Sequence, residues 1–229
     1  DVLVVINPNN PTGKMFPIET LLTWHQQLSI KGGWLIVDEA FMDVTPERSL
    51  LSSGIKPGLI VLRSLGKFFG LAGVRCGFVI TDEALLQRIA TKLGPWSLTG
   101  PTRYIAKQAL ADADWQNKTR EQLTNAGVRL HKTLKEHGLT PEGGTALFQW
   151  LTHPKTKEIY QACASQGILI RYFEKQARTK SSICEHEVSL PSLRFGLPAK
   201  EEQWQRLINV LAILSDLINT TETMNKTYA

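Results

Sequence analysis

Cysteine is scarce in this sequence, and long hydrophobic runs are missing. The three cysteines among 229 residues, Cys76, Cys163 and Cys184, are odd in number and widely spaced. Such usage is typical of a reducing compartment and argues against a disulfide-stapled secreted domain. No His or Cys pair has the short spacing of a zinc site, so we expect no metal centre. No apolar run reaches the ~20 residues of a membrane-spanning helix, so we expect no membrane partner.

The first residues lack the features of a secretory leader. Residues 1–6 (DVLVVI) have neither a basic flank nor a small-residue cleavage site. They are typical of a buried strand instead. Together with the cysteine usage, this pattern leads us to expect a cytoplasmic protein.

Positive charge is present but not concentrated. Lys and Arg number 26 against 21 Asp and Glu, which gives a formal net charge of +5. The densest basic group is Arg171, Lys175, Arg178 and Lys180, and no aromatic platform accompanies it. Nucleic-acid grooves combine such charge with stacking aromatic rings. We therefore expect no nucleic-acid partner and interpret the group as a solvated loop or a contact for an anionic substrate.

One stretch combines a lysine, a hydroxyl, glycines and a second cation. Residues 63–77 read RSLGKFFGLAGVRCG and follow a strand-like run at residues 59–63. Lys67 can act as a nucleophile toward a carbonyl carbon. Ser64 and Arg75 offer a hydroxyl and a planar guanidinium that suit a phosphate. A site with both abilities suits pyridoxal 5'-phosphate (PLP), which carries an aldehyde and a phosphate on one ring.

Two upstream segments place polar residues directly after strand-like runs. Asn10 lies in NPNNPTG (residues 7–13), and Asp38 begins DEAF (residues 38–41). Open α/β sheets bind ligands at the carboxyl ends of their strands, so we expect Asn10, Asp38 and Lys67 to converge on one pocket. Asn10 and Asp38 also have structural interpretations, as a turn residue and as a loop or helix-cap residue.

Strand and helix patterns alternate through about the first half of the chain, and the pattern changes after residues 94–95. The alternation predicts a largely parallel sheet with helices on its faces, and the second part predicts an α+β layer. We therefore expect an α/β domain over residues 1–113 and a smaller C-terminal domain over residues 114–229. The expected strands are residues 2–6, 34–37, 59–62, 77–80, 147–151, 168–171 and 192–195, and the expected helices include residues 101–113, 115–137, 155–166 and 201–219.

Five short motifs carry a resemblance to a known family. They are NPTG (10–13), DEA (38–40), SLGK (64–67), RCG (75–77) and LRFG (193–196). On these motifs the chain resembles the fold-type-I PLP-dependent enzymes, the aspartate aminotransferase superfamily. The resemblance implies a PLP-dependent transferase-like large domain, PLP as cofactor, and a homodimer with its active site between two subunits. It also implies a further N-terminal part that supplies a phosphate contact and a ring-stacking residue.

Within the superfamily, the chain is most similar to the threonine-phosphate decarboxylases of cobalamin biosynthesis. GPWSLTGP (94–101), GGTALF (143–148) and LRFGLP (193–198) carry this narrower likeness. It implies a lyase that converts L-threonine O-3-phosphate to (R)-1-amino-2-propanol O-2-phosphate. Two alternatives stay open: a histidinol-phosphate-type aminotransferase, which uses the same catalytic residues, and a PLP-sensing domain of a transcription regulator.

The resemblance implies a role for each residue of the expected cofactor site. Lys67 binds the cofactor aldehyde and later carries protons at the α-carbon of the substrate. Asp38 faces the pyridine nitrogen and keeps it protonated, and Asn10 donates to the phenolic oxygen. Ser64 and Arg75 contact the phosphate.

Two arginines are candidates for binding the substrate. Arg194, in a late strand, is implied to hold the α-carboxylate. Arg171, after the strand-like residues 168–170, is either a second anion contact or a surface arginine. Phe41 departs from the superfamily, in which many aminotransferases have a tyrosine whose hydroxyl reaches the phenolic oxygen. Because Phe41 has no donor, more weight falls on Asn10.

Overall fold

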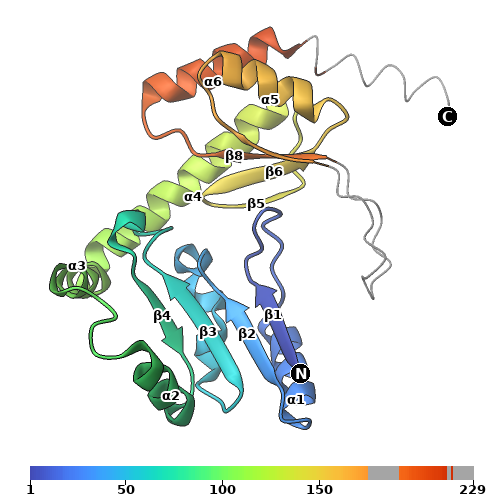
Figure 1. Ribbon diagram of the computed structural model, residues 1–229. Helices are drawn as coiled ribbons and strands as arrows, with labels where there is room; N and C mark the ends of the chain where they lie inside the picture. Colours follow the sequence, from blue (N-terminus) through green and yellow to red (C-terminus); the bar gives the residue numbers. More distant parts are fainter. Residues whose placement is uncertain (175–190, 216–217, 219–229) are drawn as a thin grey trace. The chain divides into compact units, whose positions relative to one another are not determined.

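The computed structural model describes residues 1–174, 191–215 and 218 (Figure 1). The chain divides into two compact units, Asp1–Leu123 and Thr124–Ala229, and the boundary falls within helix α4 (Ala113–Glu136). The domain boundary predicted from the sequence lies at the start of this helix, at residues 113 and 114. Four residues singled out above lie outside the described ranges: Cys184, Lys175, Arg178 and Lys180.

Four strands form the sheet of the first unit (Figure 1). They lie in the order β1 (Val2–Ile6), β2 (Trp34–Asp38), β3 (Leu59–Ser64) and β4 (Gly77–Ile80). The first three strands are parallel, and β4 is antiparallel to β3. The mostly parallel sheet predicted from the alternating pattern is therefore confirmed, and three strands end at the same edge.

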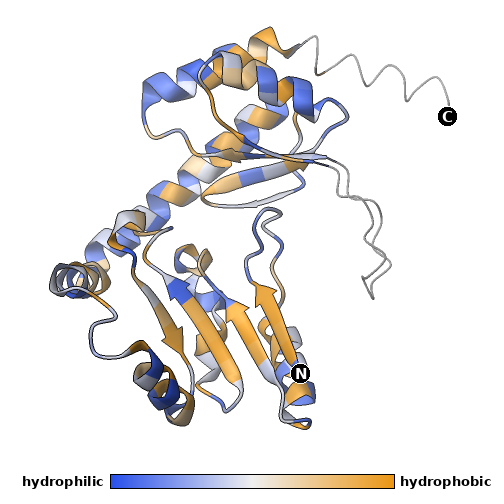
Figure 2. Ribbon diagram, viewed as in Figure 1, coloured by the Kyte–Doolittle hydropathy of each residue, from blue (hydrophilic) through white to orange (hydrophobic). Residues whose placement is uncertain are grey.

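Helix α1 (Ile18–Ser29) covers one face of this sheet. Burial alternates along β2, so that Leu35 and Val37 pack in one core with Leu21 of the helix and Val61 of β3. The strands of this unit are mostly hydrophobic in Figure 2, with polar residues where β2 and β3 end. Each buried aliphatic side chain contributes about 1.5–3 kcal/mol, so this core holds the strands that lead into the candidate site.

A second cluster of buried side chains anchors the loop that follows β3. Phe68 and Phe69 come directly after Lys67, and their rings lie 5.5 and 5.8 Å from the ring of Trp115 in α4. Leu65 is buried in the same cluster. The apolar residues of the loop therefore fix its backbone, while Lys67 itself is exposed.

Two helices and four 3₁₀ turns complete the first unit. Helix α2 (Glu83–Leu93) begins after Asp82, whose Oδ1 accepts a hydrogen bond from the Leu85 amide at 3.1 Å. This contact is a typical N-cap, which satisfies one free amide of the first turn. The remaining elements are α3 (Gly100–Ala111), η1 (Met42–Val44), η2 (Pro46–Arg48), η3 (Leu50–Ser53) and η4 (Ala72–Val74).

The second unit is an antiparallel sheet covered on one face by helices (Figure 1). Its core joins Leu134 of α4 to Leu151 and Leu193 of the sheet. In the described ranges, no helix combines the length and the apolar character needed to cross a membrane. The predicted α+β layer is confirmed. Its elements are β5 (Gly143–Thr145), β6 (Phe148–Thr152), α5 (Thr156–Ser165), β7 (Arg171–Phe173), β8 (Ser192–Gly196) and α6 (Glu201–Ile213), and the strand order is β5-β6-β8-β7.

The strand expected at residues 168–171 is displaced in the structure. The Ile168 amide donates to the Cys163 carbonyl at 2.9 Å, which caps the end of α5. Gly167 has a positive φ of 72°, which favours glycine and reverses the chain there. Ile168 therefore belongs to the end of the helix, residues 169–170 form no strand, and β7 begins at Arg171. The prediction of a strand ending at this arginine was wrong.

Candidate active site

The segments that carry the predicted cofactor-binding residues follow strands ending at one edge of the first unit's sheet. The register pairs Ile6, the last residue of β1, with Asp38, the last residue of β2. Asp38 is in turn paired with Leu62, and β3 ends two residues later at Ser64. Parallel strands present the loops after their carboxyl ends to a common region. The structure thus brings the three strand ends to one edge, and convergence of Asn10, Asp38 and Lys67 on one pocket stays a prediction.

The loop that contains Asn10 is closed by other side chains. Asn7 is wholly buried, and its Oδ1 accepts a hydrogen bond from the Phe16 amide at 2.7 Å across the loop. The Oδ1 atom of Asn9 accepts from the Thr12 hydroxyl at 2.8 Å. These are typical turn contacts of asparagine. Asn10 thus lies in a loop whose turn is built by its neighbours, and donation to the cofactor stays a prediction for it.

Asp38 and Lys67 come from adjacent loops. Oδ1 of Asp38 accepts a hydrogen bond from the Ala40 amide at 2.9 Å, the local contact expected of an aspartate after a strand. Lys67 Nζ lies 5.3 Å from the centroid of the Phe41 ring, within the range of a cation–π contact. The amine of the loop after β3 therefore reaches the loop after β2, three residues beyond the carboxylate.

Ser64 and Arg75 stand at the two ends of the loop that carries the lysine. The antiparallel register places Ser64 opposite Gly77, and Ser64 Oγ accepts a hydrogen bond from the Gly66 amide at 3.0 Å. Arg75 has a left-handed backbone with φ of 55°, which is uncommon for a residue other than glycine. Its Nη1 donates to the Ala72 carbonyl at 3.0 Å. Ser64 and Arg75 thus flank the loop in the chain, and a joint contact with a phosphate stays a prediction for them.

Arg171 and Arg194 lie together in the second unit. They are direct partners in the antiparallel pairing of β7 and β8, so their side chains share one face of the sheet. Both line a pocket of about 530 Å³, together with Tyr160 and Gly196. Burial and the positive charge of Arg171 lower the pKa of Arg194. An anion in the pocket would offset both effects, because each disfavours the charged guanidinium.

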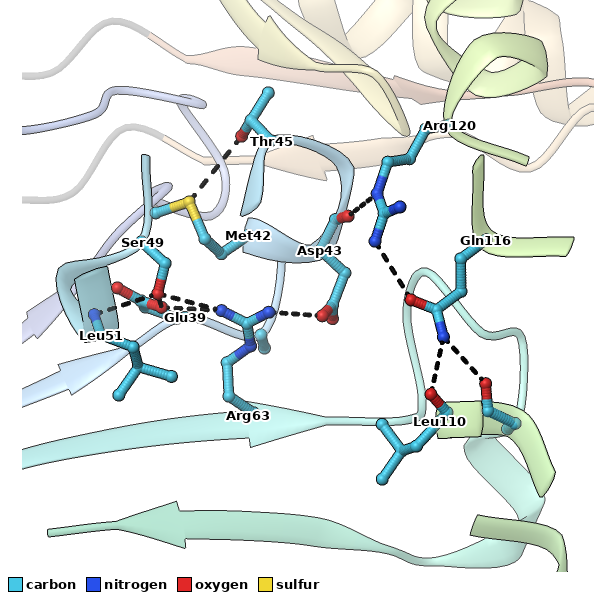
Figure 3. Close-up of polar contacts among 12 residues, drawn as sticks. Glu39, Met42, Asp43, Thr45, Ser49, Leu51, Arg63, Leu110, Gln116 and Arg120 are labelled. Carbon is cyan, nitrogen blue, oxygen red and sulfur yellow. Dashed lines mark hydrogen bonds and ion pairs between the residues drawn. The ribbon is translucent and has the colours of Figure 1, made fainter. Parts of the chain in front are cut away.

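A charged cluster that could not be predicted from the sequence lies beside the predicted site (Figure 3). It consists of Glu39, Asp43 and Arg63, joined by two ion pairs. Its signal in the sequence is adjacency, because Glu39 follows Asp38 and Arg63 precedes Ser64. Adjacency alone does not reveal pairing, since the partners are 20 and 24 residues apart and meet only through the register of β2 and β3.

Comparison with known families agrees with this arrangement. The model of the family described as aminotransferase class I and II matches residues 1–209. The chain belongs to this family. The resemblance that five motifs carried is thereby confirmed, and the motifs lie within the matched residues.

Relatives within the family include enzymes of two names. A threonine-phosphate decarboxylase of Pseudomonas aeruginosa is 50% identical over 207 residues, which are 90% of this chain and 58% of the relative. A threonine-phosphate decarboxylase of Sinorhizobium sp is 39% identical over 76% of the chain and 52% of the relative. A histidinol-phosphate aminotransferase of Legionella pneumophila is 30% identical over 92% of the chain and 56% of the relative. The chain thus spans somewhat more than half the length of these relatives.

Solved structures share the fold. A histidinol-phosphate aminotransferase of Sinorhizobium meliloti in complex with pyridoxal-5'-phosphate matches with a TM-score of 0.73 at 23% identity, over 96% of this chain and 58% of that chain. The L-threonine-O-3-phosphate decarboxylase of Porphyromonas gingivalis matches with a TM-score of 0.71 at 20% identity, over 94% and 65%. At these identities the comparison establishes the fold alone, and it confirms the predicted α/β fold.

Proposed function

We propose that this chain is part of a PLP-dependent threonine-phosphate decarboxylase of cobalamin biosynthesis. The reaction would convert L-threonine O-3-phosphate to (R)-1-amino-2-propanol O-2-phosphate with release of carbon dioxide. The observation that carries the proposal is the 50% identity to a threonine-phosphate decarboxylase over 90% of the chain. The donor groups at the carboxyl edge of the first unit's sheet support it.

These donor groups fit PLP by their chemistry. Ser64 and Arg75, at the base of the loop, would hold the phosphate through a hydroxyl and a guanidinium. Asp38 would face the ring nitrogen, and Asn10 the phenolic oxygen. Lys67 would bind the aldehyde carbon through its amine. When bound, PLP supplies an electron sink for the bond that breaks at the α-carbon of the substrate.

Residues of the first unit would control protons during the reaction. Asp38 would keep a proton on the ring nitrogen, because a carboxylate there favours the charged form. The amine of Lys67, once released by the substrate amine, would deliver a proton to the α-carbon in place of the lost carboxylate. The net change at the α-carbon is thus loss of carbon dioxide and gain of one proton.

Residues of the second unit would bind the substrate. Arg194 would hold the carboxylate and Arg171 the phosphate, because guanidinium forks match both anions. The shared face of the two arginines and their common pocket support this assignment. Which bond of the α-carbon breaks depends on how these contacts orient it, so the two arginines would decide between decarboxylation and amino transfer.

A histidinol-phosphate aminotransferase is the second candidate. It is favoured by the 30% identity to the Legionella pneumophila enzyme of that name over 92% of the chain.

We also infer a homodimer that works in the cytoplasm. Light scattering on the complete gene product tests the dimer, and a monomer at working concentration would contradict it.

The decisive assay measures carbon dioxide released from L-threonine O-3-phosphate by the complete gene product with PLP. We expect release without an added keto acid, and Lys67→Ala to lower it about a thousandfold or more, since a nucleophile and proton carrier is lost. Lys92→Ala, which removes an exposed lysine of α2, is the matched control and should retain activity. Amino transfer from histidinol phosphate to a keto acid without carbon dioxide release would favour the second candidate instead.

A further inference from the structure

A buried charged cluster joins two neighbouring strands of the first unit (Figure 3). Glu39 is wholly buried, and its Oε2 accepts hydrogen bonds from Arg63 Nη1 at 2.9 Å and from Ser49 Oγ at 2.5 Å. Oε1 accepts from the Leu50 amide at 2.7 Å. Arg63 Nη2 donates to Asp43 Oδ1 at 2.5 Å. Both oxygens of the buried carboxylate are therefore satisfied, as a charge inside a protein requires.

The cluster lies directly beside two residues of the candidate cofactor site. Glu39 follows Asp38 directly, and Arg63 precedes Ser64 directly. Neighbouring side chains of an extended chain point to opposite faces. The register therefore puts the ion pair on the opposite face from Asp38 and Ser64, one residue away from each. The cluster holds the two strand ends together from behind the candidate cofactor site.

Arginine is suited to this task by its shape. The guanidinium of Arg63 is planar and uses separate nitrogens for Glu39 and Asp43, so it fixes the separation of the two carboxylates. A lysine would provide the same charge as a single point and could not bridge them with the same geometry. Substitution by lysine therefore removes the geometric constraint while the charge remains.

A second arginine extends the cluster toward the lysine loop. Arg120 Nε donates to the Asp43 carbonyl at 2.9 Å, and its guanidinium lies 5.4 Å from the centroid of the Phe68 ring. Phe68 follows Lys67 directly. Asp43 thus connects Arg63 to Arg120, and Arg120 in turn contacts the residue that follows Lys67.

We propose that Arg63 is a positioning residue that sets the separation between Asp38 and Ser64. This inference rests on the proposed function, in which Asp38 and Ser64 contact the ring nitrogen and the phosphate, at opposite ends of one rigid molecule. An error in their separation prevents both contacts from forming at once. Arg63 therefore acts on cofactor affinity through Ser64, without touching the cofactor.

A double-mutant cycle on PLP affinity tests this proposal. In the complete gene product, Ser64→Ala removes the hydroxyl contact, and Arg63→Lys relaxes the separation. We expect Ser64→Ala to weaken PLP binding about tenfold in the wild type but less than about twofold in the Arg63→Lys background, because the contact is already lost there. The matched control is Arg129→Lys, which alters the exposed ion pair with Glu201 in the second unit and should leave the effect of Ser64→Ala unchanged.

A second variant guards against loss of folding. Glu39→Gln/Asp43→Asn/Arg63→Met removes all three charges of the cluster, so that neither buried carboxylate is left without its partner, and it should abolish the coupling in the same way. Equal effects of Ser64→Ala in wild type and in folded Arg63 variants would overturn the positioning role while PLP binding by the wild type upholds the proposed function. A wild type that does not bind PLP would overturn both.

Discussion

The two units of the chain differ in the chemistry of their predicted site residues. The first unit gathers five different groups near one sheet edge, namely an amine, a carboxylate, an amide, a hydroxyl and a guanidinium. The second unit carries two identical groups, Arg171 and Arg194, on paired strands that line one pocket. A varied donor set suits a ligand with several different functional groups, whereas two cations suit a ligand with two anionic ends.

This difference indicates which part of the proposed reaction each unit would carry out. The first unit would bind the cofactor and move protons, and the second would recognise the substrate. The charged groups behave accordingly. In the first unit, Arg63 forms ion pairs with Glu39 and Asp43, and its proposed role is to position the strand ends. In the second, burial and the positive charge of Arg171 lower the pKa of Arg194, and a bound anion would offset both effects.

The largest expected effect comes from the first unit. Asp38→Ala removes the carboxylate proposed to keep the ring nitrogen charged, so we expect kcat to fall about a hundredfold to a thousandfold. The KM for L-threonine O-3-phosphate should change little, because the proposed substrate contacts lie in the second unit. Steady-state kinetics with saturating PLP measures both quantities, and Asp114→Ala, at an exposed acid of α4, is the control. A raised KM with an unchanged kcat would contradict the proposed division of roles between the two units.

A smaller effect is expected from the second unit. Arg194→Met removes one charge-assisted contact to the substrate, so we expect KM to rise about tenfold to a hundredfold. The affinity for PLP should stay within about twofold of wild type, since the proposed cofactor contacts lie in the first unit. Titration with PLP and steady-state kinetics check the two expectations, and Arg206→Met, at an exposed arginine of α6, should alter neither. If Arg194→Met lost PLP and substrate alike, the division between the units would be contradicted.

Much of the fold could be predicted from the sequence, because its signals are local. The strands of the first unit are short apolar runs followed by turn residues, and β4 spans the predicted residues 77–80. The wrong prediction of a strand at residues 168–171 also has a local cause. The end of α5 uses the amide of Ile168, and an apolar run cannot reveal whether its first residues cap a helix or pair with a strand.

The candidate site could likewise be predicted only in part from the sequence. Motifs next to strand ends predicted Asn10, Asp38, Ser64 and Lys67, because parallel strands bring their carboxyl ends together. Glu39 and Arg63 could not be predicted as partners, since their pairing depends on the register of two strands. The motif residues could therefore be identified from the sequence, whereas the contacts of Glu39 and Arg63 required the structure.

The proposed function depends most on Lys67, whose amine would bind PLP. Reduction of the PLP-loaded gene product with borohydride fixes the cofactor on the amine that holds it, and mass spectrometry of a digest identifies the modified residue. We expect the modified peptide to contain Lys67, with about one cofactor bound per protein chain. Modification spread over exposed lysines such as Lys92, or no modification at all, would contradict it.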